Sequence, residues 1–124
     1  MEIAYEFGFD AAHHFLHQPE GHLYRRMHGH SFFVEVAIAG DPDPATGFVV
    51  DLAALEAASD ELRRQLDHTL LNDVPGLEVP SLENIAIWTW ERLAPQFSGL
   101  ARVTVRRPSC RQSCVYRGYN QTRR

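Results

Sequence analysis

The sequence predicts an α+β fold whose elements follow the order ββααββ. Segments in which polar and apolar residues alternate occur at both ends of the chain, and two segments with helical apolar spacing lie between them. Paired strands that flank two helices favour an antiparallel sheet with both helices on one face. Because domains of about 100–150 residues are common, we expect residues 1–124 to form a single domain.

The first two strands are predicted from their alternation. Residues 2–13 place large apolar side chains on one face and mostly polar or small ones on the other, and His13 continues the apolar face. Residues 30–39 repeat the pattern, and His28 and His30 share their apolar register. The apolar positions are Ile3, Tyr5, Phe7 and Phe9 in the first strand and Phe32, Val34, Val36 and Ile38 in the second.

Two helices follow, each with a start signal and one apolar stripe. Asp51 is the expected N-cap of a helix that runs to about Leu66, and Ser81 is the expected N-cap of a second helix that ends near Pro95. The first stripe consists of Leu52, Leu55, Ala58 or Ser59, Leu62 and Leu66. The second consists of Leu82, Ile85, Ala86, Trp88 or Thr89, and Leu93.

The last two strands complete the order. Ala101, Val103 and Val105 alternate with Arg102, Thr104 and Arg106. Residues 113–118 are predicted to form a final short strand.

Composition excludes several classes of function. No window approaches the roughly 18 apolar residues that a membrane span requires, and the first residues lack the features of a signal peptide. We therefore expect a cytoplasmic protein, with Cys110 and Cys114 as free thiols or a weak metal pair. An overall charge of −4 opposes nucleic-acid binding.

The charge is unevenly distributed along the chain. Residues 1–97 contain all 16 acidic residues and five arginines, whereas residues 98–124 contain seven arginines and no acidic residue. The arginines of this second segment are either an anion contact, since arginine binds phosphate and carboxylate in a bidentate manner, or a solvated strand face.

The strongest chemical signal is a group of three histidines. His28 and His30 are two residues apart in a strand, so they project to the same side, with Gly29 between them leaving room for another group. If the first two strands pair antiparallel, His13 at the end of the first strand lies beside His28 and His30 at the start of the second. Three imidazoles without a fourth protein ligand are typical of a catalytic zinc site. The nearby His14, His17 and His22 break this register or lie in a loop, which favours supporting contacts or solvent exposure.

Asp67 and His68 follow the first helix. A carboxylate beside an imidazole can raise its basicity, as proton transfer requires, although a histidine at the end of a helix also has a purely structural explanation.

These motifs resemble those of the 6-pyruvoyl tetrahydropterin synthases and, more closely, the 6-carboxytetrahydropterin synthases of queuosine biosynthesis. The matching stretches are FDAAHHF (9–15), PEGH (19–22), HGHSF (28–32), TGFVVDLAAL (46–55), LDHTLLNDVPGLEVPSLENIA (66–86) and CVYRG (114–118). The resemblance implies the T-fold, in which subunits form a trimeric barrel and two trimers stack into a homohexamer with active sites between subunits. It also implies zinc on His13, His28 and His30, a catalytic pair at Asp67 and His68, and 7,8-dihydroneopterin triphosphate as the substrate.

Two positions depart from the family pattern. Tyr24 occupies the place of the catalytic cysteine, four residues before the histidine pair, and a phenol with a reference pKa of about 10 is a poorer base than a thiolate. The family also binds the amino edge of the pterin with a glutamate in the third strand, but no acidic residue follows Glu91 here. Either Glu83 or a backbone group replaces that glutamate, or the ligand is different and has an anionic edge suited to Arg106 and Arg107.

Three hypotheses follow from the sequence. The chain is a zinc-dependent pterin lyase of the queuosine type, or a paralogue with the same metal and another small-molecule substrate, or a zinc-binding protein without catalytic activity.

Overall fold

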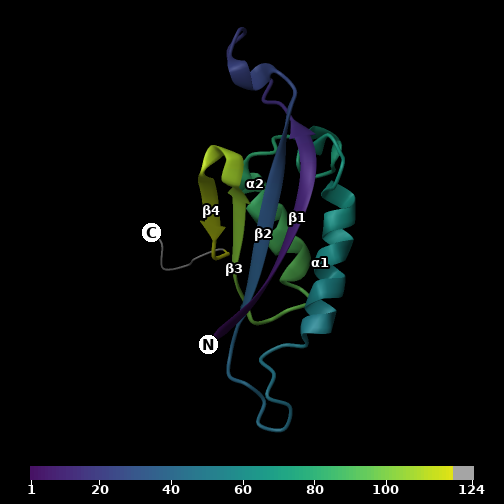
Figure 1. Ribbon diagram of the computed structural model, residues 1–124, viewed down its shortest axis with the longest axis vertical. Helices are drawn as coiled ribbons and strands as arrows, with labels where there is room; N and C mark the ends of the chain where they lie inside the picture. Colours follow the sequence, from purple (N-terminus) through teal and green to yellow (C-terminus); the bar gives the residue numbers. More distant parts are fainter. Residues whose placement is uncertain (119–124) are drawn as a thin grey trace.

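The computed structural model describes residues 1–118 and contains four strands and two α-helices (Figure 1). The strands are β1 (Glu2–His13), β2 (His28–Ala39), β3 (Leu100–Arg107) and β4 (Gln112–Tyr116), and the helices are α1 (Leu52–Leu66) and α2 (Leu82–Leu93). Three short 3₁₀ helices, η1 (Leu23–Arg25), η2 (Leu71–Asp73) and η3 (Pro108–Cys110), lie in the connections. The strands form one antiparallel sheet in the order β1-β2-β3-β4, which confirms the predicted ββααββ order.

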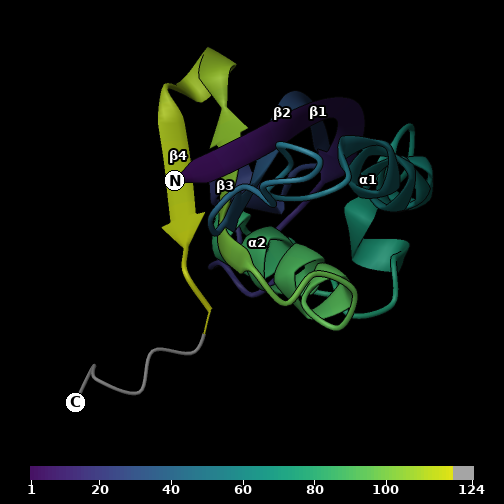
Figure 2. The same cartoon turned by 90° about the horizontal axis from the view of Figure 1, so that it is seen from below.

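The sheet has one buried face, and both helices pack on it (Figure 2). Alternate residues of β1, β2 and β3 point to this face, as the period of two requires. α1 packs against β1, while α2 packs against β3 and β4. The core between these layers contains Phe7, Phe9, Phe32, Val34, Val36, Val103 and Val105 from the sheet.

Both helices begin where their caps predict. The Asp51 carboxylate accepts a hydrogen bond from the Ala53 N–H at 3.0 Å, and the Ser81 hydroxyl accepts one from the Asn84 N–H at 3.1 Å. The buried face of α1 consists of Leu55, Ser59, Leu62 and Leu66, and that of α2 of Leu82, Ile85, Ala86, Trp88, Thr89 and Leu93. The expectation that Leu52 is buried was wrong, because it lies in the first turn of α1 and is 37% exposed.

The ends of two strands differ from the prediction. β2 begins at His28 rather than at residue 30, because the pairing with β1 continues to the contact between His13 and His28. β4 spans residues 112–116 rather than 113–118, and the chain turns at Gly118, where φ is +76°. Of the C-terminal arginines, Arg123 and Arg124 lie outside the described residues.

The connection between β1 and β2 determines where the site lies. It carries η1 and projects beyond one end of the sheet, the end at which β1 finishes and β2 starts (Figure 1). In residues 1–118, no helix has the length and apolarity that crossing a membrane requires.

Candidate metal centre

Three histidines converge at this end of the sheet. The antiparallel register places His13 opposite His28 and Ala11 opposite His30, so the three side chains share one face. Their ring centroids are 4.5 Å apart for His13 and His28, 5.0 Å for His13 and His30, and 4.9 Å for His28 and His30. One ring nitrogen from each histidine lies within 4.8 Å of the other two, a spacing that one metal ion can bridge.

His13 is fully buried and its tautomer follows from its contacts. The Nδ1 atom lies 3.2 Å from the carbonyl oxygen of Pro80, and a carbonyl only accepts, so Nδ1 carries the proton. Burial is the main cause that lowers the pKa of His13 from 6.5 to about 4, so the ring is neutral near pH 7. Nε2 therefore has a lone pair but no hydrogen-bond partner among the described residues. A buried acceptor without a protein partner is available to coordinate a metal ion.

The other two histidines are held in a similar way. The Arg26 carbonyl oxygen lies 2.7 Å from Nδ1 of His28, which leaves Nε2 available to a metal ion. Nδ1 of His30 lies 3.9 Å from the Cys110 sulfur. Burial, followed by the positive charge of Arg107, lowers the pKa of His30. Three neutral imidazoles form a donor set that fits zinc and leaves a fourth position for water or substrate.

The end of β1 is fixed from the η2 side. The Asn72 side chain accepts a hydrogen bond from the His14 N–H at 3.1 Å and donates one to the His14 carbonyl at 3.0 Å. These two bonds hold the backbone directly after His13, a supporting role that the sequence does not reveal. Among residues 1–118, Gly29 makes no close approach, since a Cβ atom there would lie 3.6 Å from the Ala11 carbonyl oxygen, an ordinary contact.

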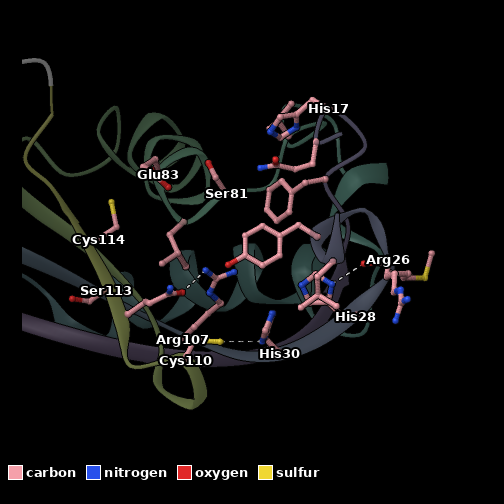
Figure 3. Close-up of a pocket in the computed structure, with 18 residues that line it drawn as sticks. His17, Arg26, His28, His30, Ser81, Glu83, Arg107, Cys110, Ser113 and Cys114 are labelled. Atoms are coloured by element: carbon pink, nitrogen blue, oxygen red, sulfur yellow. Dashed lines mark hydrogen bonds between the residues drawn. The ribbon is translucent and has the colours of Figure 1, made fainter. Parts of the chain in front are cut away.

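The histidines border a cavity of about 1130 Å³, large enough for a small organic ligand (Figure 3). His28 and His30 line one end of it. The opposite wall comes from the start of α2, with Ser81 and Glu83, and from Cys114 of β4 (Figure 3). Burial and the Glu83 carboxylate raise the pKa of the Cys114 thiol.

Tyr24 lies in the same cavity. It belongs to η1, is 45% exposed, and its ring centroid is 6.4 Å from that of His28. Tyr24 is therefore close to the three histidines. His22 supports it, because its Nδ1 accepts a hydrogen bond from the Tyr24 N–H at 3.0 Å. His17 also lines the cavity.

Asp67 and His68 lie elsewhere. Nδ1 of His68 is 3.1 Å from the Asp67 carboxylate, but the His68 side chain is 80% exposed and faces a second, shallower hollow on which Tyr24 does not lie. The pair is fixed to β1, because Asp67 accepts a hydrogen bond from the Asp10 N–H at 2.9 Å and the His68 N–H donates to the Asp10 carbonyl at 2.7 Å. His68 adopts φ +59°, a conformation that is uncommon for residues other than glycine.

Arg106 and Arg107 point in opposite directions. Arg106 forms an ion pair with Glu6 at 3.0 Å and does not line the cavity, whereas Arg107 does line it. The alternation along β3 already contains this distinction, since Val103, Val105 and residue 107 share the buried face. The sequence prediction grouped Arg106 with Arg107 as contacts to the ligand, although this alternation places their side chains on opposite faces of the sheet.

The α+β fold, the three converging imidazoles and the adjoining cavity together define a protein that can bind a metal ion and a small ligand at one site. A family model described as "6-pyruvoyl tetrahydropterin synthase" matches residues 2–119, and the chain belongs to that family.

Individual relatives agree with this membership. The chain is 46% identical over 99 residues to the 6-carboxy-5,6,7,8-tetrahydropterin synthase of Synechocystis sp., a match that covers 75% of each chain. It is 34% identical to the dihydroneopterin monophosphate aldolase of Pyrococcus furiosus, with 78% of each chain covered. The structure of Caenorhabditis elegans 6-pyruvoyl tetrahydropterin synthase superposes with a TM-score of 0.84 at 26% identity, covering 96% of both chains. The fold is therefore the T-fold of this family.

Proposed function

We propose that the protein is a zinc-dependent pterin lyase that resembles 6-carboxy-5,6,7,8-tetrahydropterin synthase and converts 7,8-dihydroneopterin triphosphate in queuosine precursor biosynthesis. The observation that carries the proposal is the set of three converging histidines in a chain that is 46% identical to a synthase of that name. We infer that it works in the cytoplasm as a homohexamer, a dimer of trimers.

The side chains of the cavity have distinct roles in this proposal. His13, His28 and His30 hold the zinc ion, which when bound supplies a Lewis acid that polarises the hydroxyl groups of the substrate side chain. Glu83 faces the cavity from α2 and accepts hydrogen bonds from the amino edge of the pterin, in place of the glutamate that the family has in its third strand. Arg106 is not needed for this role, because its partner is Glu6.

Three groups can accept the proton that the reaction removes. Tyr24 and Cys110 lie in the cavity with His28 and His30, whereas the pair of Asp67 and His68 lies at a second hollow, where another copy of the chain can bring it to the cavity. Each route has its own test, since Tyr24→Phe, Cys110→Ser and His68→Asn each remove one group. A general acid or base typically contributes about 10²–10⁴-fold in rate, so the responsible substitution stands out from the others.

The deciding experiment is an assay of zinc-loaded protein on 7,8-dihydroneopterin triphosphate, with the product identified by its mass. Formation of 6-carboxytetrahydropterin supports the proposal, and Glu83→Gln should then raise the KM more than it lowers kcat, because Glu83 binds a part of the substrate that does not react. Absence of product, with zinc present at one ion per chain, would contradict the proposal.

A second candidate is a paralogue that acts on a different substrate or that binds zinc without catalysis. Tyr24 at the family's cysteine position and the absence of acidic residues after Glu91 favour it. One relative of this chain is named dihydroneopterin monophosphate aldolase, so relatives of similar sequence carry names for different reactions. Binding of a pterin without turnover would support this second candidate.

A further inference from the structure

Arg107 is one of the two arginines that line the cavity, together with Arg26. It ends β3, and its guanidinium extends into the cavity on the side of His30 and Cys110 (Figure 3). Glu83 stands on the other wall beside Cys114 (Figure 3). The cavity is therefore polar at two separate places, with a positive group near the histidines and a negative group on the α2 side.

The hydrogen-bonding capacity of Arg107 is not used up by the protein. One Nη atom donates to the Gln112 side-chain oxygen, while Nε is buried and has no partner among the described residues. By contrast, Arg102 is paired with Glu2 and Glu35, and Arg63 is paired with Asp60. No carboxylate of residues 1–118 forms an ion pair with Arg107.

The surroundings of Arg107 strengthen its attraction for an anion. Part of the cavity wall is apolar, and the buried Leu82 belongs to it, so a charge there is screened less than on an open surface. A guanidinium with open donors binds the two oxygens of a carboxylate or phosphate in one plane, which a lysine ammonium cannot do.

We propose that Arg107 binds an anionic group of the ligand, a phosphate or a carboxylate, next to the three histidines. The ligand is therefore a small molecule that carries an acidic group at the end lying beside the candidate metal centre. This inference deepens the proposed function, on which it rests in assigning the ligand to the same cavity.

The test measures anion binding to the zinc-loaded protein and does not depend on turnover. The thermal unfolding midpoint is followed while chloride is replaced, at constant ionic strength, by inorganic phosphate in one series and by benzoate in another. A ligand of the folded state raises the midpoint in a concentration-dependent way. The variants are Arg107→Gln, Arg107→Lys and Arg102→Gln; the last removes the same charge from the same strand but outside the cavity.

At least one of the two anions should raise the midpoint of the unmodified protein. Arg107→Gln should abolish that increase, Arg107→Lys should keep part of it, and Arg102→Gln should keep all of it. The series in which the midpoint rises shows whether the site binds phosphate or a carboxylate. Equal zinc content in the four proteins shows that their metal centres are intact.

Two results would overturn the inference. One is an increase that survives Arg107→Gln, because the anion would then bind to zinc or elsewhere. The other is no increase with either anion in the unmodified protein, as expected if a carboxylate of another copy already occupies Arg107. An increase that depends on Arg107, together with no product from 7,8-dihydroneopterin triphosphate, would leave this inference intact and remove the proposed function.

Discussion

His13 has an environment that its position in the sequence only partly explains. It is fully buried, and the Pro80 carbonyl fixes its proton on Nδ1. The period of two in the first two strands is enough to group it with His28 and His30 from the sequence alone. The Pro80 carbonyl and the Cys110 sulfur could not be predicted, because those contacts come from residues far along the chain whose position depends on tertiary packing.

The first prediction concerns zinc content. Purified protein should contain about one zinc ion per chain, since three neutral imidazoles satisfy a zinc site with an open position. His28→Ala should remove most of the metal, as measured by atomic emission on dialysed protein. His17→Ala serves as the control, because His17 lines the same cavity but is not one of the three converging histidines. Full zinc content in His28→Ala would show that other residues hold the ion.

A second prediction concerns the pH dependence of stability at Asp67. The hydrogen bond from the Asp10 N–H, followed by the contacts with His68 and Arg63, lowers the pKa of the Asp67 carboxyl. A lowered pKa in the folded state stabilises the protein above the pKa of the unfolded chain, about 3.9 for aspartate. That contribution is lost as the pH falls through the folded-state pKa.

Urea unfolding of Asp67→Asn should therefore show reduced stability at pH 7, and the difference from the unmodified protein should shrink below about pH 4. Asp73→Asn is the matched control, because Asp73 is exposed and its carboxylate makes no hydrogen bond or ion pair in residues 1–118. A difference that stays constant from pH 7 to pH 3 would contradict this account.

At the scale of the elements, α1 contains a polar group that its surroundings do not satisfy. Ser59 is buried in the face of the helix that packs on the sheet, and its hydroxyl has no hydrogen-bond partner among the described residues. Alanine has the higher helix propensity and no polar atom to bury. We expect Ser59→Ala to raise the free energy of unfolding by about 1 kcal/mol, measured as a higher urea midpoint with an unchanged slope.

Thr89 in α2 provides the contrast to Ser59. Its buried hydroxyl donates to the Ile85 carbonyl at 2.9 Å, so Thr89→Ala removes a formed hydrogen bond and a buried methyl group. This second variant should lower the urea midpoint. A loss of stability in Ser59→Ala as well would show that the Ser59 hydroxyl is satisfied, for example by a buried water.

The elements were predictable where a local signal marks them. Asp51 and Ser81 cap their helices through their own side chains, so the start of each helix is encoded in a few neighbouring residues. The start of β2 and the exposure of Leu52 depend instead on how far the neighbouring strand or layer extends. Strand ends and exposure of this kind are determined by tertiary packing, so the periodicity of the sequence does not predict them.

For the whole molecule, the two outer strands raise the question of assembly. β1 and β4 lie at the ends of the sheet order, and within residues 1–118 neither has a second neighbouring strand, apart from one isolated bridge between Ala12 and Leu70. Unpaired edges are usually covered or closed into a barrel. Copies of the chain can close this sheet edge to edge, which agrees with the hexamer that the resemblance implies.

The position of His68 outside the histidine cavity also favours an assembly of several copies. The exposed His68 side chain faces a hollow that also includes His30 and Met27, whereas Tyr24 lines only the main cavity. A second copy that brings its His68 to the main cavity would complete a site built from two chains. Sedimentation velocity at micromolar concentration should then give a hexamer, and a monomer alone would rule out a site built from two chains.

Complementation tests the shared site directly. His28→Ala and His68→Asn should each reduce turnover strongly, and asparagine is chosen because it tolerates the positive φ at position 68. In oligomers assembled from equal amounts of both variants, each site draws its His28 and its His68 from different chains, so about a quarter of the sites are intact. Co-expression with two affinity tags, followed by sequential purification, isolates these mixed oligomers. Recovery of activity near that fraction supports a site built across the interface, whereas mixed oligomers as inactive as either parent would place both residues in sites within single chains.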